Sequence, residues 1–187
     1  NYIKRNFSEQ FLVRQSRFLF SQNNINTLRD SLMEEFGWSL DLPWGWDIVK
    51  KVSDSNIVWL GKEMPYQWIG ISWSKGDIAN TELAVGKHIW EWPKNNYKSI
   101  QFSHYKFDLE KADNHNFVAW RATGIWETSD LLESKGGPFR SYVFYDNKKD
   151  LTYHLNYLIF HPGSSKSIFF RQIFGKMKIL ENRDFGV

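Results

Sequence analysis

The sequence predicts an α+β fold, in which one antiparallel sheet is covered on its apolar face by a long N-terminal helix and a C-terminal helix. Three observations predict this class. Apolar residues follow a helical period at the start of the chain, alternate with polar residues through its middle, and end in a hairpin followed by a second helical pattern. The chain therefore divides into a helical arm, residues 1–36, and an α+β domain, residues 37–187.

The first element is an amphipathic helix between Phe7 and Phe36. Four of its apolar residues are separated by seven positions: Phe11, Phe18, Ile25 and Leu32. A break near residues 21–24, where serine and asparagine offer an N-cap, would give two helices instead of one. One continuous helix would reach about 45 Å. It would pack on its own domain or also contact a missing N-terminal region or a partner.

Strands follow, because the period changes to two after Gly37. Four segments predict an antiparallel meander, the first two joined by the turn PWG: WSLDLP (38–43), WDIVKKV (46–52), SNIVWLGKE (55–63) and YQWIGISWS (66–74). Residues 77–96 fit either a short helix over 80–90 or an irregular connection ending at Pro93. Residues 97–107 and 118–128 alternate as strands, and the acidic segment 108–113 between them reads as a solvated loop.

The C-terminal part predicts a hairpin and a helix. Residues 134–163 form two strands around the polar turn DNKKD. Ser164 or Ser165 would then cap a helix whose apolar residues face the sheet: Ile168, Phe169, Ile173, Met177 and Leu180.

Composition excludes several classes of function. The 24 basic and 21 acidic residues are interspersed, and a net charge of +3 without basic runs argues against nucleic-acid binding. The absence of cysteine rules out disulfides and thiolate metal sites. The histidines lack metal-binding spacing, so no metal or cofactor is expected. No apolar run reaches the ~20 residues of a membrane helix, so membrane attachment would need a lipid anchor upstream of Asn1.

Tryptophan is the most informative residue type, because all ten lie between residues 38 and 126. Most are expected in the core, but indoles near a turn are often exposed and serve as flat platforms for sugars or partner proteins. We therefore name as contact candidates the indoles beside the PWG turn and those in HIWEWPK: Trp44, Trp46, Trp90 and Trp92.

Two charged residues of one predicted strand are further candidates. Arg121 and Glu127 are six apart, so they share a face unless Gly124 forms a bulge, and Trp120 and Trp126 share the other face. This is the pattern of a half-buried strand. It also fits a recognition surface with Arg121 as an anion anchor, or an enzyme site completed by a histidine.

Five segments resemble successive signatures of a Bacteroidota envelope protein family, domain of unknown function 4837: DLPWGW, NIVWLGKE, RATGIWE, GGPFRSYVFYD and YLIFHPGSSKSIFFRQI. The resemblance covers about residues 30–180 and departs at 75–96. It implies the C-terminal half of an exported lipoprotein, located in the cell envelope on the periplasmic side or at the outer-membrane surface. A weaker resemblance is to the α+β sandwich of the photosystem-associated PsbP and Mog1 group, whose members act as binding or assembly factors.

The leading hypothesis is a non-enzymatic protein of the cell envelope that binds another protein or is a structural subunit of an envelope complex. The sequence offers no catalytic set that would favour an enzyme. The alternative is a glycan-binding module that uses exposed tryptophans.

Overall fold

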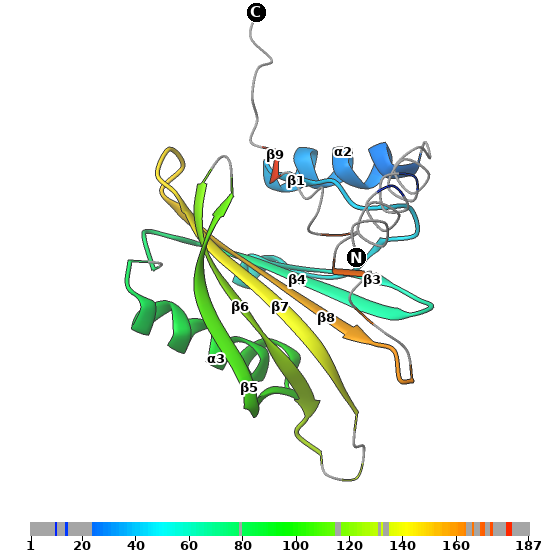
Figure 1. Cartoon of the computed structure of the whole chain (residues 1–187). Helices are drawn as coiled ribbons and strands as arrows, with labels where there is room; N and C mark the ends of the chain where they lie inside the picture. Colours follow the sequence, from blue (N-terminus) through cyan, green and yellow to red (C-terminus); the bar gives the residue numbers. More distant parts are fainter. Residues whose placement is uncertain are drawn as a thin grey trace, which may run out of the picture. The chain divides into compact units, whose positions relative to one another are not determined.

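The structure is a computed structural model (Figure 1). It describes residues 24–78, 80–114, 117–130, 132, 135–163, 166, 169, 170, 173, 179 and 180, with 10 and 14. The chain forms two compact units, one made of residues 1–47 and 165–187 and the other of residues 48–164.

The first unit contains helix α2 (Asn24–Phe36) and a two-stranded antiparallel sheet. Strand β1 (Ser39–Leu40) pairs with β9 (Ile179–Leu180). The predicted hairpin around PWG is therefore wrong: its first strand pairs near the C-terminus, although a turn does occur at residues 44–45. Most of residues 7–23 and of the predicted C-terminal helix lie outside the described residues.

The second unit is built on a seven-stranded sheet in the order β2-β3-β4-β8-β7-β6-β5. The pairings β3–β4, β4–β8, β8–β7, β7–β6 and β6–β5 are all antiparallel. The strands are β2 (Asp47–Val52), β3 (Ile57–Lys62), β4 (Tyr66–Lys75), β5 (Ile100–Asn114), β6 (Phe117–Thr128), β7 (Gly136–Asp146) and β8 (Leu151–Phe160). The α+β class and the C-terminal hairpin are confirmed, and the rest of the meander is present as β2, β3 and β4.

The acidic segment 108–113 is part of β5, so the predicted loop is wrong. Its residues continue the alternation of the strand: Phe107 and Leu109 pack against the core, while Asp108 and Glu110 are exposed. In a strand at the edge of a sheet, the charged residues of the exposed face can be mistaken for a surface loop. Only the apolar residues that alternate with them indicate a strand.

Helix α3 (Glu82–Tyr97) packs against the sheet near β5, β6 and β7 (Figure 1). Of the two alternatives for residues 77–96, the helix over 80–90 is therefore confirmed, although α3 extends past Pro93. The expectation that only terminal helices cover the sheet did not include it. The Thr81 hydroxyl caps the helix by accepting the backbone N–H of Ala84 at 3.2 Å. Pro93 lies inside the helix, where it removes one backbone donor without ending the helix.

The core of the second unit lies between α3 and the sheet. Val85 and Ile89 of the helix are fully buried there. They share it with buried side chains of β5 to β8, which are Phe102, Trp120, Ala122, Trp126, Phe139, Val143 and Leu158. Within it Phe102 and Phe139 stack with ring centroids 3.6 Å apart. The sheet and α3 therefore form one hydrophobic core that holds the helix in place.

Candidate functional site

The contact between α3 and the sheet depends on a glycine. A Cβ atom added at Gly70 of β4 would lie 2.4 Å from Trp92 Cη2 and 2.5 Å from the Tyr97 hydroxyl. Both side chains belong to α3. The missing side chain therefore lets two large aromatic residues of the helix lie directly on the strand.

Polar side chains accompany these aromatic contacts. The Trp92 indole donates to Ser72 Oγ at 2.9 Å, and the Tyr97 hydroxyl donates to Asn156 Oδ1 at 3.3 Å. Asn156 Nδ2 in turn donates to Ser141 Oγ at 2.7 Å. Ser141 and Asn156 are fully buried. These bonds satisfy polar groups that would otherwise be costly inside the core, so we read them as structural.

Two histidines form the most unusual contact of this interface. His88 Nε2 of α3 lies 3.1 Å from His154 Nδ1 of β8, within hydrogen-bonding distance. His154 is only 1% exposed, and its ring also packs against Trp92 with centroids 4.9 Å apart. A histidine from the helix is thus bonded to a histidine from the middle of the sheet.

Burial sets the protonation of this pair. It lowers the pKa of His154 well below its usual value, and the neighbouring charge of His88 would lower that pKa further. Burial also lowers the pKa of His88, against the opposing influence of Glu91. Both rings are therefore neutral at pH 7, so one donates its N–H and the other accepts with its lone pair.

A second feature lies where β5 bulges beside α3. Ser103 to Lys106 of β5 stand opposite only Ile125 of β6. A Cβ atom at Gly124 would come 2.2 Å from the backbone oxygen of Lys106, so glycine is needed for the bulge to approach β6. The bulge is therefore on β5 and not at Gly124 of β6, so successive side chains of β6 still alternate between the two faces of the sheet.

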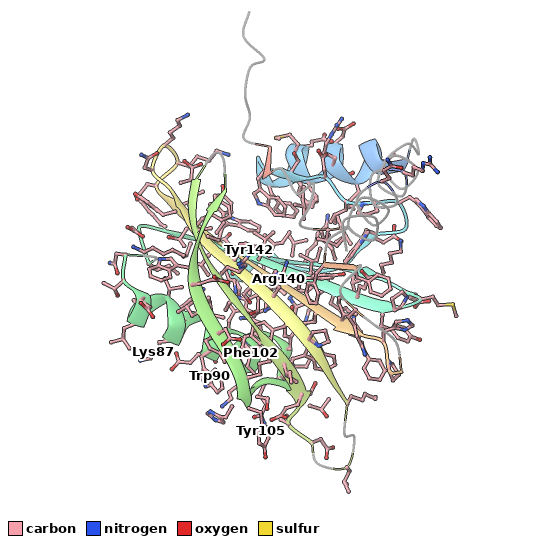
Figure 2. The ribbon with its side chains drawn as sticks, viewed as in Figure 1. Lys87, Trp90, Phe102, Tyr105, Arg140 and Tyr142 are labelled. Carbon is pink, nitrogen blue, oxygen red and sulfur yellow. The ribbon has the colours of Figure 1, made fainter. Side chains whose placement is uncertain are left out.

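The bulge raises aromatic side chains next to the helix. Trp90 of α3 packs on His104 with ring centroids 4.6 Å apart. On its other sides Trp90 contacts Phe102 and Phe107. Tyr105 is 95% exposed. Figure 2 shows Trp90 beside Phe102, with Tyr105 near the start of β5. We call Trp90, His104 and Tyr105 the β5 bulge surface.

Arg121 and Glu127 do share one face of β6, as predicted, but they serve separate partners. Two guanidinium nitrogens of Arg121 donate to Glu110 Oε1 at 3.1 and 2.6 Å, and this bond raises the pKa of Arg121. Glu127 Oε1 accepts a bond from Gln101. Their face is opposite to the one that carries His154 and the core. The described residues therefore do not bring Arg121, Glu127 and a histidine into one site.

The tryptophan candidates have different environments. Trp44 is 44% exposed, whereas Trp46 and Trp92 are each 4% exposed. Trp90 is partly buried against other rings. Trp44 and Trp46 belong to one unit, and Trp90 and Trp92 to the other.

Sequence reasoning missed the histidine pair and the exposed members of the bulge surface. His88 lies in the segment whose structure was left open, and its pairing with His154 joins positions 66 residues apart. A usable signal was the spacing of Val85, Ile89 and Trp92 after Thr81, which marks a capped helix with one apolar face.

Within the described part of the chain, no group of three or more histidine, aspartate or glutamate residues is arranged to hold a metal ion. Among the same residues, no helix is long and apolar enough to span a membrane.

The chain is thus an α+β protein whose described residues form a mostly antiparallel seven-stranded sheet with helix α3 packed on it. It belongs to the family described as Domain of unknown function (DUF4837), whose model matches residues 24–178. No curated protein matches it.

Among solved structures, the chain is similar to a crystal structure from Bacteroides thetaiotaomicron VPI-5482 at 1.50 Å resolution. The two are 12% identical with a TM-score of 0.33, over 79% of this chain and 46% of the other. This chain therefore spans less than half the length of that protein, and a likeness at this level does not establish a shared fold.

Proposed function

We propose that this protein is a non-enzymatic binding module of the cell envelope, and that it contacts another protein through the β5 bulge surface. The observation that carries the proposal is the exposure of Tyr105, which is 95% accessible on a bulge beside Trp90 and His104. Tyrosine and tryptophan are enriched in the contact regions of protein interfaces, where they bury large areas.

The local structure supports this role. An exposed aromatic ring gains free energy when a partner covers it, by about 25 cal/mol per Å² of apolar area. Trp90 is held by Phe102 and Phe107, so it would form a rigid base under the exposed ring of His104, next to Tyr105 in the chain. Rigid anchors lose little conformational entropy on binding. The surface thus combines an accessible tip with a support that is already ordered.

The proposed location rests on a resemblance of sequence segments. DLPWGW, NIVWLGKE and GGPFRSYVFYD resemble signatures of a Bacteroidota envelope protein family. We therefore extend the proposal to a partner in the periplasm or at the outer membrane, including the case in which this chain is a structural subunit of a larger envelope complex.

One observation favours glycan binding as a second candidate: Trp44, beside the turn at residues 44–45, is 44% exposed. A sugar-binding platform usually needs an open aromatic face. Trp46 and Trp92 are buried and cannot provide one without rearrangement. The glycan proposal therefore depends on Trp44 and predicts that its fluorescence changes when envelope polysaccharides are added.

The protein-binding proposal can be tested by site-specific photo-crosslinking in native cells. A photoreactive phenylalanine analogue replaces Tyr105, and the matched control carries it at Met64, which is 89% exposed in the turn between β3 and β4. We expect one defined crosslinked protein at position 105 but not at 64, and loss of its co-purification in Tyr105→Ser. Identical patterns at both positions, or none at 105, would refute the proposal.

A further inference from the structure

The histidine pair is a structural link between two elements that are separate in sequence. His88 belongs to α3 and His154 to β8, and their nitrogens are 3.1 Å apart. The link needs one N–H and one lone pair, so it cannot form when both rings carry a second proton. The contact therefore exists only while at least one ring is neutral.

The surroundings offer little to stabilise a charged His154. Ser72 of β4 and Val143 of β7 flank it in the sheet, and both are uncharged. From α3 it meets the ring of Trp92, whose neighbour Tyr97 is a partly buried phenol. Glu91, also on α3, is the charged group that acts on His88. In the described structure, the charge that acts on His154 comes from His88, which repels a second proton.

We propose that the His88–His154 pair makes the attachment of α3 to the sheet sensitive to acid, so that this attachment weakens as the pH falls below about 6.5. The direction follows from proton binding. Burial lowers the pKa of both histidines, so the attached state binds fewer protons than the released state. Attachment is thus complete above the usual imidazole pKa, near 6.5, and is weakened as the pH falls through it.

The size of the effect follows from the same balance. Below pH 6.5 a histidine takes up a proton when α3 is released, but not while it is buried and neutral in the attached state. For one such ring, the equilibrium between attached and released α3 shifts toward release by about 30-fold at pH 5.0. His154, which is 1% exposed, is the ring that most closely meets this condition.

Release of α3 would also alter the β5 bulge surface, because Trp90 is on the same helix. Partner binding would then weaken in acid. This consequence rests on the proposed function, whereas the release itself does not.

The test is hydrogen–deuterium exchange of the full chain at pH 7.5 and 5.0, corrected for the intrinsic pH dependence of exchange. We expect residues 82–97 to lose about 30-fold protection at pH 5.0, while β6 and β7 keep theirs. His154→Leu should abolish most of this difference. The matched control His161→Gln, at the histidine that directly follows β8, should behave like the parent.

Three results would overturn the proposal: equal protection of α3 at both pH values, equal loss throughout the sheet, or an unchanged pH effect in His154→Leu. If that variant does not fold, an NMR titration of the histidine rings in the parent decides the question. We expect His154 to stay neutral until the signals of α3 change. Protonation of His154 near pH 6.5 with α3 still attached would contradict the proposal. Failure to bind a partner, with α3 still released in acid, would refute only the proposed function.

Discussion

Two glycines that face the same interface should respond in opposite directions to the same substitution. Gly70 lies on β4 beneath α3, and Gly86 lies within α3 itself. Replacing either by alanine adds one methyl group. Comparison of the two variants therefore distinguishes a steric clash at Gly70 from the effect that any replacement of glycine by alanine would have.

At Gly70 the added methyl group has no room. It would lie 2.4 Å from Trp92 Cη2, whereas carbon atoms in ordinary contact are about 3.5–4.0 Å apart. The helix must therefore move by about 1 Å, which typically costs about 1–3 kcal/mol. Displacing Tyr97 also weakens its bond to Asn156, worth about 1 kcal/mol. After subtracting about 0.5–1 kcal/mol for the lost freedom of glycine, we expect Gly70→Ala to destabilise the protein by about 1–3 kcal/mol.

At Gly86 the balance is reversed. The new methyl group would meet only Leu109 Cδ2, at 3.3 Å, which is the end of a flexible side chain. Alanine is favoured over glycine in a helix by about 1 kcal/mol. We therefore expect Gly86→Ala to stabilise the protein by about 0.5–1 kcal/mol.

Urea unfolding followed by tryptophan fluorescence measures both changes, provided that the slope of free energy against urea concentration stays constant. A Gly70→Ala variant as stable as the parent would refute the reasoning, since it would mean that Trp92 and Tyr97 do not lie on the strand. Equal destabilisation by both substitutions would show that the specific close approach at Gly70 is not the cause.

Three further predictions follow from the same structure. Because burial lowers the pKa of His88 and His154, the free energy of unfolding from urea titrations should be constant above pH 7. It should fall between pH 6.5 and 5, by up to about 1.4 kcal/mol per pH unit for each ring kept neutral; an increase on acidification would contradict this sign. Gly124→Ala should destabilise by at least about 2 kcal/mol and expose the bulge to proteolysis, because the methyl group meets backbone that cannot rotate away; a stable, protease-resistant variant would show that the bulge does not need this glycine. Arg121→Ala should change the free energy of unfolding by less than about 1 kcal/mol, since its pair with Glu110 is largely solvated, and a larger loss in thermal unfolding would assign it a structural role.

Local patterns in the sequence predicted the elements whose partners are close in the chain. The hairpin of β7 and β8 has alternating strands around a polar turn, so both its strands and its pairing are visible. The alternation of β6 likewise predicted that Arg121 and Glu127 share a face. Pairing of Ser39 with Leu180 left no such sign, because it joins opposite ends of the chain.

The candidate site was less accessible for a related reason. Proline usually ends a helix, so Pro93 obscured α3 and with it the positions of His88 and Trp90. Tyr105 is exposed because β5 has more residues than β6 at the bulge, which depends on how the two strands pair. The periodicity of one strand does not reveal its pairing, so it could not predict this exposure.

The bulge in β5 also bears on how the protein behaves at high concentration. β5 is the last strand in the order of the sheet, and a long regular edge strand would offer a row of backbone groups to a strand of another molecule. The irregularity between Phe102 and Phe107 divides this edge into two shorter stretches with different registers. The same four residues that display Tyr105 should therefore hinder intermolecular sheet growth, so straightening the bulge by deletion would favour fibrillar aggregation.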